Sequence, residues 1–159
     1  MNRVLRLLPV VFALACLGMG GAPKITVRFY VEANPRDTEA FSTPITFTNP
    51  PRQAFIEKVP SINERTIRSM YPFQAADGTW GAAFLLDNKG RIELEAASTL
   101  RRGSSMVVFV VTKHGIHQVV DMVIDKPVRD GIITIPKGLT ELEIRALAKE
   151  YKLMVPAKK

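Results

Sequence analysis

Apolar and polar residues alternate along the segment from Lys24 to Glu32, and the apolar positions carry β-branched or aromatic side chains. The apolar residues are Ile25, Val27, Phe29 and Val31. A period of two places such residues on one side of an extended chain. The pattern therefore predicts a β-strand that is buried on one face.

Short apolar or β-branched runs, bounded by Pro, Gly and Asn, predict further strands. They span residues 45–48, 54–59, 80–86, 106–111, 118–124 and 131–136. The run 106–111 contains no polar residue and predicts a central strand that is covered on both faces. Asp77-Gly78 predicts a hairpin turn before residues 80–86, and Lys113-His114-Gly115 predicts one between 106–111 and 118–124.

Three segments have the spacing of helices. Ser61 and Glu64 have the spacing of a capping box and predict a short helix that runs to about residue 70. A second helix is predicted from residue 91 to 102, closed by Gly103, and a third begins after Thr140 with Glu143 completing another capping box. The predicted buried positions are Ile92, Ala96, Ala97 and Leu100 in the second helix and Leu142, Ile144, Leu147, Ala148 and Tyr151 in the third.

Strands interleaved with helices, with hairpins among the strands, predict an α+β fold: a mixed or antiparallel sheet with two to three helices packed on it. The chain has 159 residues, of which 47% are hydrophobic and 23% charged, as in folded globular proteins. We expect a leader at 1–22, a single domain at 23–152 and a basic tail at 153–159.

The leader has the features of a secretory signal. Arg3 and Arg6 form a positively charged start, residues 7–14 are mostly apolar, and Ala13-Leu14-Ala15 provides small residues next to a cleavage point. The apolar stretch is shorter than the roughly 20 residues that cross a bilayer. We therefore expect an exported, periplasmic protein.

Cys16 is the only cysteine and follows Ala15 directly, at the place where a bacterial lipoprotein carries its acylated residue. The segment 13–16 resembles a lipobox, although Ala13 stands where Leu is commonest. Two interpretations stay open: lipidation of Cys16, with anchoring to a membrane, or plain secretion after a nearby cut. In both cases an intramolecular disulfide is impossible.

The formal net charge is +7, and removing Arg3 and Arg6 with the leader leaves 20 basic against 15 acidic residues. This moderate excess favours anionic lipid, anionic envelope polymer or acidic partners. The basic residues are scattered among acidic ones and are not clustered with aromatic residues. We therefore do not expect nucleic-acid binding.

Few residues have side chains and a spacing that point to catalysis or metal binding. His114 and His117 form an H-x-x-H pair, which leaves a small metal-dependent protein or hydrolase as one alternative. Residues three apart on a strand point to opposite faces, so we expect two exposed turn histidines that do not converge with Asp121. No nucleophile elbow or phosphate-binding glycine loop is present. We assign no catalytic residue, no metal ligand and no cofactor.

From about residue 61 to 152 the order of features resembles the head subdomain of the large periplasmic region of SecD, the protein-export membrane subunit. The segments that carry the resemblance are Trp80–Asp87 with Gly90, Ser98-Thr99, Met106–Val111, Ile124 with Pro127, Gly131–Ile135 and Gly138–Ala148. These motifs are structural and not catalytic. SecD also has several transmembrane helices and a ferredoxin-like base, which are not found in this sequence.

The resemblance implies a free-standing or lipid-tethered copy of a head-like domain, a module that contacts emerging, unfolded polypeptide. Its partners would be proteins or unfolded polypeptides of the cell envelope, bound without enzymatic activity, in protein export or envelope maintenance. A structural lipoprotein that holds anionic polymer or lipid is the alternative. The loop at 34–42 is left without a role, since it fits either a binding loop or a linker.

Overall fold

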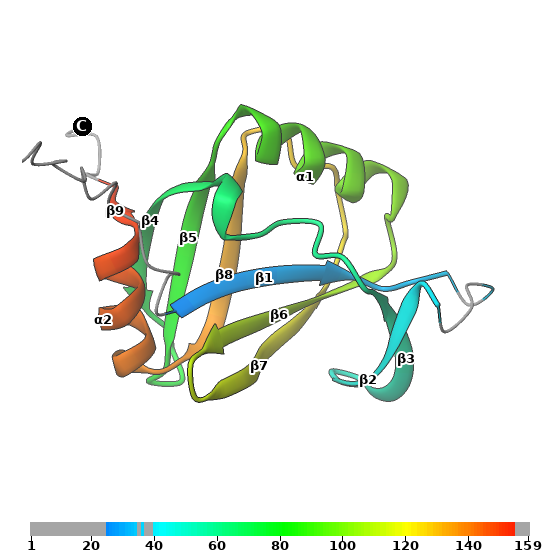
Figure 1. Ribbon diagram of the computed structural model, residues 1–159, viewed down its shortest axis with the longest axis horizontal. Helices are drawn as coiled ribbons and strands as arrows, with labels where there is room; N and C mark the ends of the chain where they lie inside the picture. The colour runs from blue at the N-terminus through cyan, green and yellow to red at the C-terminus, as the bar shows by residue number, and fades with distance from the viewer. Residues whose placement is uncertain (1–24, 35, 37–39, 155–159) are drawn as a thin grey trace, which may run out of the picture.

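The computed structural model describes residues 25–34, 36 and 40–154. Strands β1 (Ile25–Val31), β6 (Ser105–Thr112) and β7 (Gly115–Val123) form an antiparallel sheet in the order β1-β6-β7 (Figure 1). The predicted first strand and its buried face are confirmed, because its four alternating apolar side chains are at most 2% exposed.

A second sheet has four strands in the order β8-β5-β4-β9. Strands β4 (Ile67–Gln74), β5 (Trp80–Leu86) and β8 (Ile132–Leu139) are antiparallel, whereas the two-residue strand β9 (Lys152–Leu153) runs parallel to β4. The Asp77-Gly78 turn between β4 and β5 is confirmed, and Gly78 adopts the positive φ of 82° that glycine favours there.

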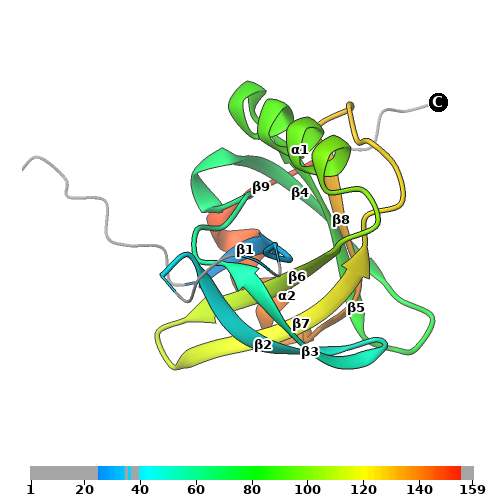
Figure 2. The ribbon, with the colours of Figure 1, turned by 90° about the vertical axis from the view of Figure 1, so that its right-hand side faces the viewer.

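Strands β2 (Ser42–Thr48) and β3 (Pro51–Glu57) form a hairpin that lies across the outer face of the three-stranded sheet (Figure 2). Phe47 and Ile56 from the hairpin pack on Val107 of β6 in a small second core. On the other face of β6, Val108 and Val110 belong to the main core. The prediction of a central strand covered on both faces is therefore confirmed.

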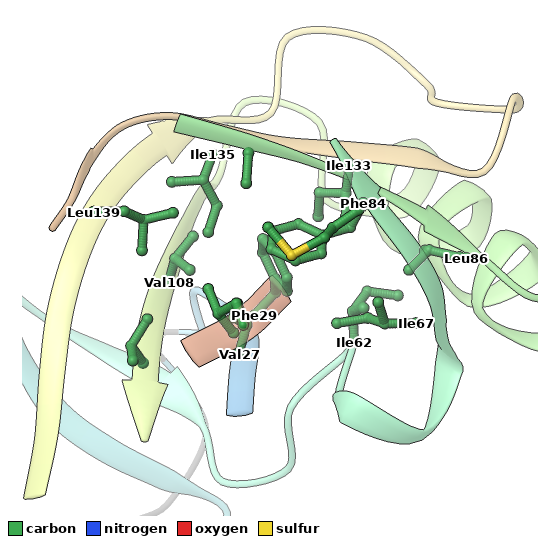
Figure 3. Close-up of a cluster of buried hydrophobic side chains, with 14 of the residues drawn as sticks. Val27, Phe29, Ile62, Ile67, Phe84, Leu86, Val108, Ile133, Ile135 and Leu139 are labelled. Atoms are coloured by element: carbon green, nitrogen blue, oxygen red, sulfur yellow. The ribbon is translucent and has the colours of Figure 1, made fainter. Parts of the chain in front are cut away.

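The main core lies between the two sheets and the two helices (Figure 3). Phe84 is at its centre and makes edge-to-face contacts with Phe29 and Tyr151, with ring centroids 6.2 Å apart in each pair. Helix α2 (Glu141–Glu150) closes one side against β1 and β5 through Ile144 and Leu147. Helix α1 (Asn88–Leu100) lies along the top of the view in Figure 1.

The helix starts are set by local side-chain bonds. The capping box of α2 is confirmed, because Thr140 and Glu143 bond to each other's backbone amides. Helix α1 begins earlier than predicted, since the side chain of Asp87 accepts a hydrogen bond of 2.7 Å from the amide of Gly90. Gly90 is inside α1 and packs closely on Thr66.

The predicted helix after Ser61 is wrong. Only a short 3₁₀ turn forms, η1 (Glu64–Thr66), which is capped by Asn63, and the chain continues directly into β4. A β-bulge between Ile67 and Ser69 shifts the register in β4, so that Ile67 and Met70 are both buried although they are three residues apart. Buried residues three apart are also typical of a helix, which accounts for the wrong prediction. The fold is α+β with two α-helices rather than two to three.

Several predicted buried positions are also wrong. Ile92 and Leu100 of α1 and Leu142 of α2 are exposed, by 54%, 80% and 77%, and Ala96 of α1 is exposed as well. The face of α1 that packs on the core carries Gly90, Leu94 and Ser98 instead, which are buried. Ile144, Leu147 and Tyr151 are buried as predicted.

The leader 1–22, including Cys16, lies outside the described residues, and the predicted tail is described only at 153–154, where Leu153 belongs to β9. In the 34–42 loop the amide of Arg36 bonds to the side chain of Asn34 at 3.0 Å, as in a turn. No helix in the described ranges has the length and apolar character needed to cross a membrane.

Candidate functional site

The candidate site lies between β7 and β8, which belong to different sheets. In the described residues β7 pairs only with β6, and β8 pairs only with β5, so each strand presents one open edge to the other. The two strands approach closely at Val119 and Gly138, where a Cβ atom on the glycine would lie 2.8 Å from the carbonyl oxygen of Val119. Glycine permits this contact, and its φ of 97° also favours glycine.

Towards Val123 and Ile132 the strands diverge and a groove of about 230 Å³ opens between them; we call it the β7–β8 groove. Its floor is apolar and includes Leu94, Met106 and Ile133, which are buried. Val123 and Ile132 form its rim and remain 58% and 38% exposed. Unbranched Met side chains adapt readily to different neighbours, so such a floor accepts side chains of different shapes.

Backbone groups on both edges point into the gap. The amide of Leu86 donates to the carbonyl of Gly131 at 2.9 Å, so these two residues form a hydrogen-bonded pair. Bonded and non-bonded pairs alternate along an antiparallel ladder, which places Thr134 in a non-bonded pair. Its N–H and C=O groups therefore point away from β5. The amide of Ile124 donates to the carbonyl of Ser104 at 2.9 Å. By the same alternation, the backbone N–H and C=O of the preceding residue, Val123, point away from β6. These groups are available to another strand.

The segment 125–131 forms a fixed wall of the groove. The amide of Val128 donates to the buried hydroxyl of Ser98 at 2.9 Å, and the side chain of Arg102 donates to the carbonyl of Asp125 at 3.0 Å. The side chain of Asp130 accepts from the amide of Ile132 at 3.0 Å and so occupies one donor of the β8 edge.

Other strand edges are covered or blocked. The outer edge of β1 bonds to the chain at Ile62, whose carbonyl accepts from the amide of Phe29 at 2.9 Å. The edge of β4 carries β9 and also Pro72, which has no amide donor, and β2 contains Pro44. Natural proteins protect exposed edges in these ways. The open edge of β8 is itself partly blocked, because the amide of Ile132 bonds to the side chain of Asp130 and Pro136 has no amide donor, which leaves Thr134 as the donor that faces the gap.

Comparison with solved structures finds a protein of similar fold. The fold is similar to that of SecDF. A structure of SecDF, described as a membrane component that enhances protein export, aligns with a TM-score of 0.50 and 13% identity over 86% of this chain and 69% of its own. SecDF in a super-membrane-facing form aligns with a TM-score of 0.51 and 13% identity over 84% of this chain and 20% of its own.

No protein-family model and no curated protein sequence matches the chain. At 13% identity the likeness to SecDF concerns the fold. The alignment covers more of the chain than residues 61–152 alone. The SecD resemblance found in the sequence is thus confirmed at the level of structure, and it extends into the N-terminal half.

The two histidines do not come together with Asp121 on this SecDF-like fold. Nδ1 of His117 lies 2.9 Å from the carboxylate of Glu143, and the amide of His114 bonds to the hydroxyl of Thr112 within the turn. In the described ranges no group of three or more His, Cys, Asp or Glu side chains is arranged to hold a metal ion.

Asp121 anchors the β2–β3 hairpin. Its carboxylate accepts from the amides of Thr48 and Asn49 at 3.0 and 2.9 Å, and also from the hydroxyl of Thr48. Burial alone would raise the pKa of Asp121, but these hydrogen bonds outweigh burial and lower the pKa below its ordinary value. The group is therefore a structural anion at neutral pH.

The groove was missed in the sequence because it depends on how two distant strands meet. Residues 131–136 were predicted as a strand, but their pattern does not say that β8 is at a sheet edge. The available signal was Gly138, since an isolated glycine in a strand often marks a close approach of another backbone.

Proposed function

We propose that this chain is an exported, non-enzymatic protein-binding module that holds an extended segment of polypeptide in the β7–β8 groove. The observation that carries the proposal is the pair of facing open strand edges above an apolar floor. An extended chain can bond to both edges through its backbone, whatever its sequence. The cavity then accepts one or two of its apolar side chains.

Strand addition suits a partner that is not yet folded. Backbone hydrogen bonds provide affinity without sequence readout, and shallow apolar sites add modest selectivity. A strand placed between β7 and β8 would join the two sheets into one. The SecDF-like fold supports the proposal, because SecDF enhances protein export. We therefore place the activity in protein export or envelope maintenance, with polypeptides of the cell envelope as partners.

The cellular location of the protein is also part of the proposal. The leader and the lipobox-like segment before Cys16 support export to the periplasm, with a lipid anchor on that cysteine. A tether would keep the groove near polypeptides that emerge at the membrane.

The test measures binding of reduced, carboxymethylated α-lactalbumin, a permanently unfolded protein, by fluorescence polarisation in 0.5 M NaCl. High salt suppresses attraction between charges. In V123D/I132D two carboxylates stand at the rim of the groove, and we expect binding to weaken at least tenfold. Both residues are exposed, so the variant should retain its fold.

The matched control is I116D/L142D, which also places two carboxylates at exposed apolar positions but outside the groove. We expect it to bind as the unaltered protein does. A second variant, Thr134→Pro, removes one backbone donor that faces the gap and should weaken binding without altering the β5 ladder. Equal binding by all these variants, or binding of native α-lactalbumin with the same affinity, would contradict the proposal.

A further inference from the structure

A second groove lies at the opposite edge of the four-stranded sheet, where β9 joins β4. We call it the β4–β9 groove; its volume is about 730 Å³. It is bounded by η1, the start of β4 and the end of α2. Since β8 and β9 are the two ends of the strand order, this groove is separate from the β7–β8 groove.

Three cationic side chains line the β4–β9 groove. Arg65 comes from η1, Arg68 from β4 and Lys152 from β9, and all three are exposed. In the part of the chain that the structure describes, none of them forms an ion pair. Like charges held near one another favour the approach of an anion.

The carboxylates nearby do not neutralise these cations. Glu64 lines the groove but faces Arg28, with 3.4 Å between Nε and Oε2. Glu150 is the other acidic residue of the lining and has an interaction of its own. The acidic residues of β3 and α1 are likewise paired, as in Glu57 with Arg101 at 2.6 Å. With Glu64 paired to Arg28, the lining of the groove keeps three cations against the carboxylate of Glu150.

We infer that the β4–β9 groove binds a phosphate group. Two guanidinium groups provide paired N–H donors that match phosphate oxygens, and an ammonium group adds a third charge. Ser69 supplies a half-buried hydroxyl and lies beside Lys152 in the register of β4 and β9. The phosphate belongs either to a phospholipid headgroup or to free inorganic phosphate, which share the same chemistry.

The experiment uses the protein with its leader removed and two probes. Inorganic phosphate is titrated while amide chemical shifts are followed, and vesicles of phosphatidylglycerol with phosphatidylcholine are sedimented with the protein. In R65Q/R68Q/K152Q we expect at least tenfold weaker binding. The matched control, K58Q/K113Q/K126Q, loses the same charge from exposed lysines outside this groove.

Each outcome decides the inference. Binding of vesicles that is lost only in R65Q/R68Q/K152Q supports a headgroup site, whereas binding of phosphate alone with the same loss supports a site for the free ion. Equal loss in both triple variants means a general charge effect and overturns the inference. Absence of binding to either probe overturns it too. None of these results depends on whether the β7–β8 groove binds polypeptide.

Discussion

The carboxylate of Glu32 holds the guanidinium of Arg52 through two parallel hydrogen bonds of 2.5 and 2.6 Å. The same arginine donates to the hydroxyl of Ser105 at 3.1 Å and lies over the ring of Phe47, with its Cζ 4.6 Å from the ring centroid. One side chain of β3 thus contacts the end of β1, the start of β6 and the neighbouring strand β2. It fastens the hairpin to the three-stranded sheet.

Replacing Arg52 with Met should reduce the free energy of unfolding by about 1 to 3 kcal/mol, because Glu32 loses its charged partner in a half-buried setting. Urea denaturation measures the change. Arg145→Met is the matched control, since Arg145 and Glu141 are also 2.5 Å apart but are largely exposed. Exposed pairs contribute little, about 0.2 to 1 kcal/mol. Equal effects of the two substitutions would show that burial does not strengthen the Glu32 pair.

The fold should lose stability in acid through Asp121 and Glu32. The hydrogen bond from Arg52 lowers the pKa of Glu32, in opposition to its burial, and hydrogen bonds lower the pKa of Asp121 despite burial. A carboxyl group with a lowered pKa stabilises the fold above its unfolded pKa of about 4, and this contribution disappears as pH falls through the folded value.

Asp121→Asn should therefore be less stable than the unaltered protein at pH 7, and the difference should shrink below about pH 4. Thermal unfolding at a series of pH values measures it. A difference that stays constant from pH 7 to pH 2 would assign the loss to altered packing and not to the charge.

Gly81→Ala should destabilise the four-stranded sheet by about 1 to 3 kcal/mol through overpacking. A Cβ atom at this position would lie 2.5 Å from the ring of Phe73 and 2.7 Å from the carbonyl oxygen of Ile135. Adding Phe73→Leu should recover only part of the loss, since the carbonyl contact remains. Full recovery in calorimetry would mean that the ring alone is responsible.

Cys16 provides a test of anchoring. If the lipobox-like segment is processed as we propose, the intact mass of the protein from membranes should match a chain that begins at an acylated Cys16. Cys16→Ser should lack the lipid mass. An unmodified mature chain with a different first residue would favour plain secretion.

Zinc should not stabilise this protein. His117 is already directed to Glu143, and the described residues bring no third ligand to the histidines. We expect the melting temperature to be the same with and without equimolar Zn²⁺, in the unaltered protein and in H114A/H117A. Stabilisation that H114A/H117A abolishes would restore the metal-dependent alternative.

Local patterns in the sequence predicted the elements whose stability is local. The Thr140–Glu143 capping box forms as predicted, because both partners are on the same turn. The same spacing at Ser61 and Glu64 predicted a helix that does not form. The following residues Ile67 and Met70 are buried in a β-strand that pairs with its neighbour, and not in a helix. Packing across the sheet overrides a weak local preference.

Neither groove was predicted from the sequence, for a related reason. Val123 and Ile132 form one rim only because β7 and β8 come from different sheets and cross near Gly138. Arg65, Arg68 and Lys152 meet only because β9 returns to β4 from the end of the chain. The basic residues scattered along the sequence predicted a positively charged protein, but not where on the fold these residues lie.

The pairing of β1 with β6 constrains the order in which this chain can fold. The register joins Ile25 to Thr112 and Val31 to Met106, so the two strands come from segments that lie far apart in the sequence. Contacts between such distant segments slow folding. Until β6 pairs with it, the apolar face of β1 lacks the strand that holds it against the core. The three-stranded sheet therefore forms only when the two ends of a long intervening segment have come together.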